Sequence, residues 1–366
     1  MSIVIPTYIS QIEPYQGGKP IKEVAREIGI AEERIIKLAS NENPLGISEK
    51  AKIAINGAIN DAARYPDGNG YYLKQAISNK FSVENNQIIL GNGSNDILEL
   101  AARTVLSVGD EVIFSEYAFA VYEIVTKAVG AIGIEAPTNN YSHNLENFLK
   151  LISVRTKLIF IANPNNPTGT LINKLALETF ISKVPSHILI VLDEAYDEYL
   201  SDDLKSDAFC WLNKYKNLLI SRSFSKAYGL AGLRIGYGVG SSRLIELMNR
   251  VRQPFNVNYF AQIAATESLK DDYFIEESRK INNQGMKQIT DAFKSLFIDY
   301  IPSFGNFVSF KLQDEKCAIM YYQHLLRNGV IVRPIANYKL PQFLRVSIGL
   351  EEENNIFIDH LSSCNI

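Results

Sequence analysis

Short hydrophobic runs alternate with amphipathic stretches between about residues 85 and 240. This alternation is typical of a mostly parallel sheet whose two faces are covered by helices. Most of the runs are hydrophobic throughout, as strands buried on both faces should be. The pattern therefore predicts an α/β fold with strands at Gln87–Leu90, Glu111–Phe114, Lys157–Ile161, Ile188–Leu192, Leu218–Ser221 and Ile235–Val239.

Two segments between these strands carry apolar residues at helical spacing, which places them on one face of a helix. We expect crossover helices over Leu171–Val184 and over the segment that contains Ile97, Leu98, Ala101, Ala102, Val105 and Leu106.

The pattern changes after about Asn258, where long charged helices replace the alternation. We expect a smaller α+β lobe there, with helices at Phe260–Lys270 and Tyr273–Phe297, a strand at Phe307–Lys311, a helix that ends at Arg327, and strands at Val330–Arg333 and Phe343–Val346.

The first 45 residues show helix signals only near Ile21–Ile28 and otherwise resemble an extended arm interrupted by prolines. The predicted division is an arm with part of the small domain over residues 1–45, a large domain over 46–270 and a small domain over 271–366. The length of 366 residues supports two lobes, since a single core rarely grows so far.

Composition narrows the classes of partner. Lys and Arg total 37 against 40 for Asp and Glu, so the net charge of −3 offers no basic field for nucleic acid or anionic lipid. The longest aliphatic run, Ile188–Leu192, is far too short to cross a membrane, and residues 1–10 show no signal-peptide pattern. Three dispersed cysteines offer no disulfide framework, and four histidines show no metal-ligand spacing. We therefore expect a cytoplasmic protein without a metal site.

A glycine-rich loop, Gly91–Asp96, follows the first predicted strand and precedes a helix. Its glycines let the backbone approach a ligand, while free amides at the helix start face an anion. Simple capping of the helix by Ser94 after a tight turn is the other interpretation. A dinucleotide fingerprint is incomplete, since Asp96 and Ser241 occupy the positions where a third glycine would stand in the two candidate runs.

Polar residues follow three further strands, at the edge where ligands bind in open α/β sheets. Asn166 lies in the Asn163–Gly169 loop, and Asp193 directly follows a buried aliphatic run. Such a carboxylate is costly to bury unless it meets a cation or several donors. The next strand leads into a glycine-rich stretch that contains Ser223, Ser225, Lys226 and Arg234.

Pyridoxal phosphate is one ligand that explains the whole set. Its aldehyde needs a lysine amine, its phosphate needs donors, its ring nitrogen needs a carboxylate and its ring needs an aromatic neighbour. A desolvated lysine beside other cations has a lowered pKa, which makes the amine nucleophilic. Tyr117, Phe119 and Tyr122 are the candidates for the stacking aromatic.

The motifs NPNNPTG at Asn163–Gly169, Asp193–Tyr196 and Ser223–Arg234 are similar, in order and spacing, to the signatures of the aspartate-aminotransferase fold of pyridoxal-phosphate enzymes. Within that superfamily the chain resembles the histidinol-phosphate aminotransferase family from about residue 10 to 350. The segments that carry this second likeness are Ser40–Gly46, Arg64–Gly68, Gly91–Asn95, Phe114–Tyr122 and Arg252–Asn258.

The resemblance implies fold type I, with a large domain whose mostly parallel sheet is flanked by helices and a smaller α+β domain. It implies Lys226 as the Schiff-base lysine and proton shuttle, and Asp193 as the partner of the pyridine nitrogen. It further implies that Asn166 and Tyr196 contact the phenolic oxygen and that Phe119 stacks on the ring, although Tyr117 remains open for that place. The cofactor phosphate would be bound by Ser94, Asn95, Ser223, Ser225 and Arg234.

For the substrates, a small amino donor and a phosphorylated acceptor, the resemblance implies contacts with Tyr15, Asn43, Tyr65, Arg333 and Arg345. It also implies a homodimer in which Tyr65 reaches a phosphate across the interface. The implied reaction transfers an amino group between glutamate and imidazole acetol phosphate. Aromatic amino acid transamination, decarboxylation of a phosphorylated threonine and a non-catalytic regulator that holds the cofactor are the alternatives.

Overall fold

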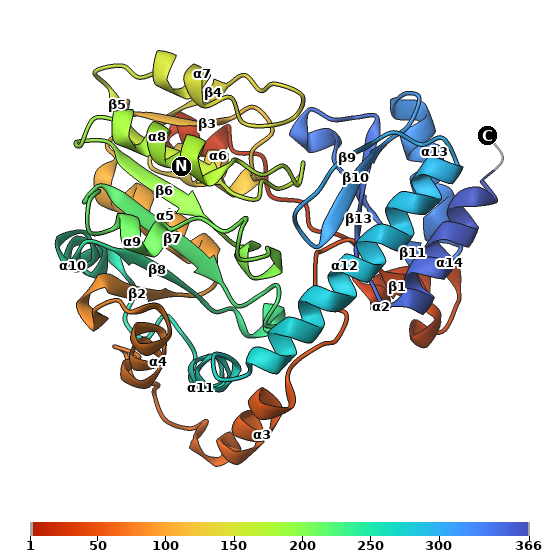
Figure 1. The fold of residues 1–366 in the computed structure, drawn as a ribbon, viewed down its shortest axis with the longest axis horizontal. Coiled ribbons are helices and arrows are strands. Elements are labelled where there is room, and N and C mark those ends of the chain that lie inside the picture. The colour runs from red at the N-terminus through yellow and green to blue at the C-terminus, as the bar shows by residue number, and fades with distance from the viewer. Residues whose placement is uncertain (1–2, 365–366) are drawn as a thin grey trace.

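The computed structural model describes residues 3–364, and these residues form three β-sheets (Figure 1). Residues 1, 2, 365 and 366, which the predicted arm and small domain include, lie outside the described residues. The largest sheet has the strand order β2-β8-β7-β6-β5-β3-β4. Its strands are β2 (Ile88–Gly91), β3 (Glu111–Ser115), β4 (Ile132–Ala136), β5 (Thr156–Ala162), β6 (Leu189–Asp193), β7 (Leu218–Ser223) and β8 (Gly236–Gly240).

Strand β8 runs antiparallel to both of its neighbours, and the other adjacent pairs of this sheet run parallel. Successive residues of a strand point to opposite faces. In β5, Ile159 and Ile161 accordingly join the apolar core on one face, while Leu158 and Phe160 join the core on the other. Burial on both faces explains why the sequence of these strands is continuously hydrophobic.

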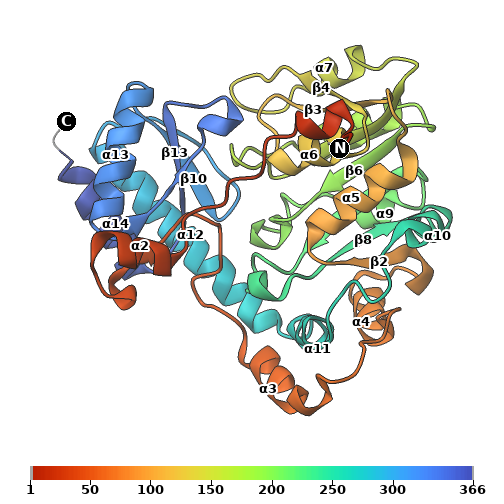
Figure 2. The same cartoon turned by 180° about the vertical axis from the view of Figure 1, so that it is seen from behind.

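Helices cover both faces of the large sheet, as Figures 1 and 2 show from opposite sides. One face is covered by α5 (Ser94–Val105), α6 (Ala120–Ala128) and α10 (Ser242–Val251). The other is covered by α4 (Tyr71–Phe81), α7 (Leu145–Lys150), α8 (Lys174–Lys183), α9 (Ala208–Trp211) and α11 (Tyr259–Ser268). Helix α3 (Glu49–Gly57) packs against α11 at the lower end of the molecule.

A second group of elements surrounds an antiparallel sheet of order β12-β13-β10-β9. Its strands are β9 (Tyr300–Ile301), β10 (Phe307–Lys311), β12 (Arg333–Pro334) and β13 (Phe343–Ser347). Apolar residues of three helices pack against it: α12 (Asp272–Ser295), α13 (Glu315–Arg327) and α14 (Glu351–Ser362). Helix α12 runs from the large sheet to this small sheet (Figure 1).

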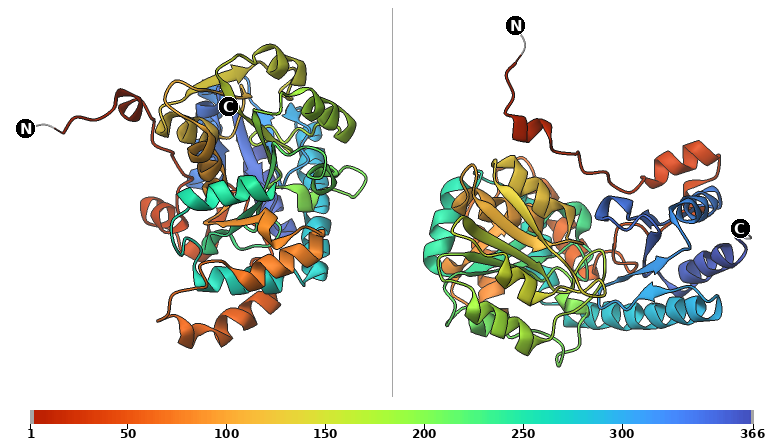
Figure 3. Two further views of the ribbon diagram at one scale, coloured as in Figure 1. Left: turned by 90° about the vertical axis from the view of Figure 1, so that its left-hand side faces the viewer. Right: turned by 90° about the horizontal axis from the view of Figure 1, so that it is seen from above.

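The N-terminal residues lie along both parts of the molecule. Strand β1 (Ile36–Lys37) pairs in parallel with β11 (Val330–Ile331) beside the small sheet, and α2 (Ile21–Ile28) packs there too. The short helix α1 (Thr7–Ser10) lies near α6, and the residues before it project from the body of the molecule (Figures 2 and 3). Short 3-10 helices occupy Glu32–Arg34, Ile59–Asp61, Asn85–Gln87, Asp197–Tyr199, Ala231–Leu233 and Ala336–Tyr338.

Each of the six strands predicted for the large sheet is present, with ends shifted by at most two residues. Three expectations need correction. The arm is not wholly extended outside Ile21–Ile28, since it also contains the helix α1 and the strand β1. The sequence pattern missed β4, because this edge strand buries only Ala136 fully. The single strand predicted over Val330–Arg333 is two short strands, β11 and β12, which belong to different sheets. The domain limits at residues 45 and 270 remain predictions.

Within residues 3–364, no helix is both long enough and apolar enough to span a bilayer.

A buried charge cluster joins β6 to β7 on the face of the large sheet that α8 and α9 cover. Arg222 contacts Glu194 and Asp197 at 2.7 Å each and Glu198 at 3.4 Å, and all four side chains are buried. Its guanidinium also lies 5.2 Å from the centre of the Phe209 ring. Burial raises the pKa of both Glu194 and Glu198 to about 7. One cation therefore compensates three acidic side chains.

Replacing Arg222 with methionine removes that cation and leaves three buried acidic side chains without a positive charge beside them, although Ser206 still donates to Glu194. Removing one side of a buried ion pair costs about 3–5 kcal/mol, and we expect R222M to lose about this much free energy of unfolding in urea. The matched control is R243M, since Arg243 pairs with Glu246 on the surface, where such pairs contribute about 1 kcal/mol or less. A loss for R222M no larger than the loss for the control would contradict the prediction.

Candidate active site

A cavity of about 370 Å³ lies at the carboxyl ends of the parallel strands, between the large and small sheets. Thirteen of the fifteen predicted site residues line it: Tyr15, Ser94, Asn95, Phe119, Asn166, Asp193, Tyr196, Ser223, Ser225, Lys226, Arg234, Arg333 and Arg345. They come from segments far apart in the sequence, so the fold gathers them at one place. Asn43 and Tyr65 are not among the residues that line the cavity.

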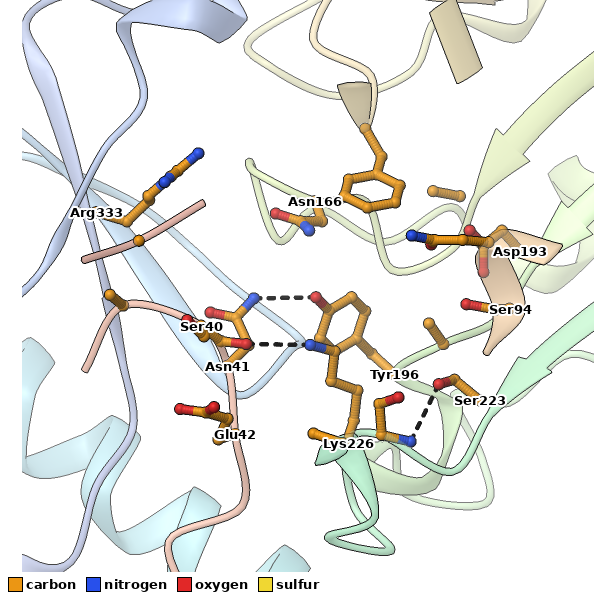
Figure 4. Close-up of a pocket in the computed structure, with 18 of the residues that line it drawn as sticks. Ser40, Asn41, Glu42, Ser94, Asn166, Asp193, Tyr196, Ser223, Lys226 and Arg333 are labelled. Atoms are coloured by element: carbon orange, nitrogen blue, oxygen red, sulfur yellow. Dashed lines mark hydrogen bonds between the residues drawn. The ribbon is translucent and has the colours of Figure 1, made fainter. Parts of the chain in front are cut away.

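Asp193 is the last residue of β6, and its buried carboxylate faces the cavity (Figure 4). The hydroxyl of Tyr122 donates to Oδ2 at 2.9 Å, while Oδ1 is buried and has no hydrogen-bond partner in the described residues. Burial raises the pKa of this carboxyl to about 6, although the Tyr122 bond and the charge of Lys226 act in the opposite direction. An N–H cation placed at Oδ1 would satisfy that oxygen and favour the ionised form.

The start of α5 and the loop after β7 form an anion cradle on one side of the cavity. No side chain caps α5, so the amides of Ser94 and Asn95 face outward from the first turn. Gly93 has a φ of +88°, and a Cβ on it would lie 2.4 Å from Nη2 of Arg234. Only glycine at position 93 lets the guanidinium come so close to the start of the helix. The guanidinium and the free amides together suit the binding of a phosphate.

Two serines complete the cradle. The amide of Ser225 donates to Oγ of Ser223 at 3.1 Å, and Arg234 donates to Oγ of Ser225 at 3.4 Å. Hydroxyl groups can donate as well as accept, so both serines can turn their protons toward an anion.

Lys226 extends into the middle of the cavity, where Nζ donates to the carbonyl oxygen of Ser40 at 3.1 Å (Figure 4). Burial, followed by the charge of Arg345, lowers the pKa of this amine to about 8 from its ordinary 10.5. At neutral pH roughly a tenth of the side chains are then neutral and nucleophilic. The amine is therefore prepared to form a covalent bond with an aldehyde.

Two arginines line the side of the cavity nearest the small sheet. Arg345, in β13, donates to Oδ1 of Asn166 at 2.5 Å and to the carbonyl of Ala39 at 3.0 Å. Its Nε is buried without a partner among the described residues. Arg333 lies with its guanidinium 5.7 Å from the centre of the Tyr15 ring. Planar guanidinium groups of this kind bind carboxylates and phosphates in a bidentate way.

Asn43 is not among the residues that line the cavity, and its predicted contact with substrate remains a prediction. Its amide donates at 2.8 Å both to the carbonyl of Ala227 and to the hydroxyl of Ser278. The side chain is thus occupied in holding the residue that follows Lys226.

Tyr65 lies on the surface with 82% of its area exposed, and its ring stacks on Phe255 with centroids 4.8 Å apart. Its predicted place across a dimer interface remains a prediction. Of the candidate stacking aromatics, Phe119 and Tyr122 line the cavity and Tyr117 does not. Tyr122 is bound to Asp193, which leaves Phe119 as the aromatic free to cover a planar ring.

The sequence analysis missed Asn41, a buried residue that lines the cavity and donates from Nδ2 to the hydroxyl of Tyr196 at 2.9 Å. Asn41 belongs to the Ser40–Gly46 motif. Which asparagine of that motif faces the cavity depends on the φ of +54° at Asn41, and the sequence does not reveal that angle.

Pyridoxal phosphate fits these residues. The unpartnered Oδ1 of Asp193 suits a protonated ring nitrogen, and the glycine-lined cradle at α5 suits the phosphate. The amine of Lys226 extends into the same cavity, across from Asp193 and Ser94, where it can meet an aldehyde (Figure 4).

Comparisons with known proteins show the family of the chain. The family model for aminotransferase class I and II matches residues 33–361. The histidinol-phosphate aminotransferase of Methylobacillus flagellatus is 56% identical to this chain and covers 97% of it, with 96% of its own length aligned. That of Nitrosospira multiformis, numbered 2, is 51% identical over 98% of this chain and 91% of its own length.

The crystal structure of histidinol-phosphate aminotransferase from Sinorhizobium meliloti, in complex with pyridoxal-5'-phosphate, superposes with a TM-score of 0.91. It covers 99% of this chain and 98% of its own, at 24% identity. This likeness shows the fold and confirms the predicted aspartate-aminotransferase-like class. The chain therefore belongs to the class I and II aminotransferases and, within them, to the histidinol-phosphate aminotransferase family.

Proposed function

We propose that this aminotransferase uses pyridoxal 5'-phosphate to transfer an amino group between glutamate or 2-oxoglutarate and imidazole acetol phosphate or L-histidinol phosphate, in histidine biosynthesis. The observation that carries the proposal is the meeting of Lys226, Asp193 and the start of α5 at one cavity. Relatives 49–56% identical over nearly the whole chain bear the name of this activity. When bound, the cofactor supplies an aldehyde for covalent attachment and a protonated ring that withdraws electrons from the reacting carbon.

Lys226 is the residue that moves the proton in this proposal. Its lowered pKa, about 8, lets Nζ accept a proton near neutral pH and return it afterwards. The carbonyl of Ser40 holds Nζ through a hydrogen bond before the covalent bond forms.

Asp193 would keep a proton on the ring nitrogen through its free Oδ1, while Tyr122 fixes the other oxygen. Ser94, Asn95, Ser223, Ser225 and Arg234 would hold the cofactor phosphate, Asn166 and Tyr196 its phenolic oxygen, and Phe119 one face of its ring. A charge-assisted hydrogen bond such as the one at Asp193 contributes about 1.5–3 kcal/mol, or one to two powers of ten in an equilibrium.

At the substrate end, Arg345 and Arg333 would bind the carboxylates of glutamate and the phosphate of the acceptor in turn. Tyr15, whose ring lies against Arg333, would close the cavity from the arm. We further propose a cytoplasmic homodimer. Several large apolar side chains support the dimer because they are exposed together over residues 53–72 and at residue 255, with Tyr65 and Tyr72 about 80% exposed.

The first test concerns the covalent bond. Borohydride reduction of the loaded protein followed by peptide mapping should find the pyridoxyl label on Lys226. Loading of the cofactor-free protein should become faster as the pH rises from 6 and level off above about 8, because the neutral amine reacts. K226A should lose the label, whereas K214A, which removes an exposed lysine, should keep it. A label at another lysine would overturn the assignment.

The second test concerns the substrate. Initial rates with L-histidinol phosphate, phenylalanine and O-phosphothreonine as alternatives should show the largest kcat/KM for the first, since two arginines face the substrate end. No turnover of histidinol phosphate would reject the proposed substrate, and the rate with each of the others would identify the activity in its place. An absorption spectrum left unchanged by glutamate would indicate a regulator that binds the cofactor without turnover.

The third test concerns the interface. Tyr65→Phe removes one hydroxyl from an exposed ring, so folding should be unaffected. We expect KM for histidinol phosphate to rise about three- to tenfold, the value of one hydrogen bond, while the cofactor affinity stays as in the wild type. Light scattering should show a dimer, and a monomer with full activity would contradict both expectations.

A further inference from the structure

We infer that Asn41 is a positioning residue that directs the hydroxyl proton of Tyr196 into the cavity, through a hydrogen-bond chain that begins at Ser347 of the small sheet. The inference rests on the proposed function, because it assigns the proton of Tyr196 to the phenolic oxygen of the cofactor. All three residues are buried, with 1%, 3% and 3% of their area exposed for Asn41, Tyr196 and Ser347.

Asn41 is held tightly by its surroundings. Its backbone has a φ of +54°, in the left-handed region that non-glycine residues rarely adopt. Its amide N–H donates to Oγ of Ser347 at 2.8 Å, and its carbonyl accepts from Nδ2 of Asn306 at 3.0 Å. Residues held in such a conformation often lie at functional sites, where the neighbouring structure fixes them.

The hydrogen bonds that join Ser347, Asn41 and Tyr196 can donate in only one order, from the serine to the asparagine and from the asparagine to the tyrosine. Oγ of Ser347 accepts the backbone N–H of Asn41, so its own proton is free to go to Oδ1 of Asn41, 3.0 Å away. Asn41 therefore turns its Nδ2 toward Tyr196, whose hydroxyl oxygen accepts at 2.9 Å (Figure 4). An amide nitrogen can only donate, so the hydroxyl proton of Tyr196 must point away from Asn41.

The open direction from that hydroxyl is the cavity. Tyr196 lines the cavity with Asn166 and Lys226, and Nζ of Lys226 lies 5.8 Å from the centre of the tyrosine ring. The ring is held from the side by Phe307, with centroids 5.3 Å apart. The O–H of Tyr196 therefore points into the part of the cavity that Asn166 also lines (Figure 4).

Tyr196 keeps its proton at neutral pH. Burial raises the pKa of its hydroxyl to about 12, and Asp193 also raises it, while Arg345 and the bond from Asn41 lower it. Tyr338 also raises this pKa, and Tyr122 and Tyr199 are further tyrosines that lie near Tyr196. Tyr196 is therefore a neutral donor over the range in which Lys226 titrates.

The same series of hydrogen bonds connects Tyr196 to the part of the cavity where Arg345 is proposed to bind substrate. Ser347 lies two residues after Arg345 in β13, and residues two apart point to the same face of a strand. Arg345 itself donates to the carbonyl of Ala39, two residues before Asn41. The arginine proposed to bind substrate and the serine that orients Asn41 thus belong to one strand and one short segment.

The experiment uses the cofactor-loaded protein and follows the pH titration of its visible absorption band. A donor at the phenolic oxygen favours the deprotonated, more negative form of the lysine-bound group and lowers its pKa. N41D replaces the donor with an acceptor that attracts the tyrosine proton. N41G removes the side chain at a position where glycine is unstrained. We expect both variants to raise the pKa of the band by about half to one pH unit, the value of one hydrogen bond.

S347A is a milder change that leaves Asn41 and Tyr196 in place but removes the group that orients the amide. We expect a smaller shift in the same direction, and this variant tests the inference if the Asn41 variants do not fold. The matched control is N354A, which removes a buried asparagine side chain in α14 that does not line the cavity and that bonds Gly349 and Gln288. It should lower the melting temperature without moving the pKa of the band.

A double-mutant cycle with Tyr196→Phe distinguishes two effects of the Asn41 variants. One is the loss of the orientation of the Tyr196 hydroxyl, and the other is a general disturbance of the cavity. Once the hydroxyl is absent, N41G should add no further shift, because the two residues act through one bond. Equal shifts from N41G with and without the hydroxyl, or no shift in N41D, N41G and S347A, would overturn the inference.

The proposed function fails in a different way. A wild-type protein with no visible band, or with no label on Lys226, would reject the cofactor assignment. If the band of the wild-type protein titrates and the variants have a band with the same pKa, only the role of Asn41 is rejected.

Discussion

Strands β5, β6 and β7 run parallel and in register, so that Ala162, Asp193 and Ser221 lie side by side at their carboxyl ends. Parallel strands end at the same edge of a sheet, and the loops that leave this edge must therefore meet. The loop after β5 contributes Asn166, the end of β6 contributes Asp193 and the loop after β7 contributes Lys226. The cavity is a consequence of this register, because one residue of slip would turn Asp193 to the opposite face.

Acidic side chains on the two faces of the sheet have different charged neighbours at this edge. Asp193 faces the cavity, which Lys226, Arg234 and Arg345 also line. The next residue, Glu194, points to the other side and joins two further carboxylates around Arg222. Adjacent acids thus have separate partners. The cluster at Arg222 fixes the chain directly after Asp193, which helps a buried carboxylate with one free oxygen stay in place.

Much of this arrangement follows from the sequence, because the strands are continuously hydrophobic and polar residues follow them directly. The place of Asp193 and Lys226 at one edge of the sheet could be predicted from such signals alone. Edge strand β4 could not, since it buries only one residue fully and carries no strong pattern. Asn41 could not be singled out either, because nothing local in its motif distinguishes it from Asn43. Their difference comes from Ser347, which lies 306 residues away from Asn41 in the sequence.

Three successive residues of the arm show why the small sheet belongs to the site. Ala39 accepts from Arg345, Ser40 accepts from Lys226 and Asn41 donates to Tyr196. The neighbouring pair of β1 with β11 holds this segment beside the small sheet. A backbone segment of three residues has little freedom to move one contact without the others. The groups proposed for substrate binding, covalent attachment and proton donation are therefore linked through one short stretch of main chain, which explains why residues before 45 must fold with the C-terminal strands for the cavity to be complete.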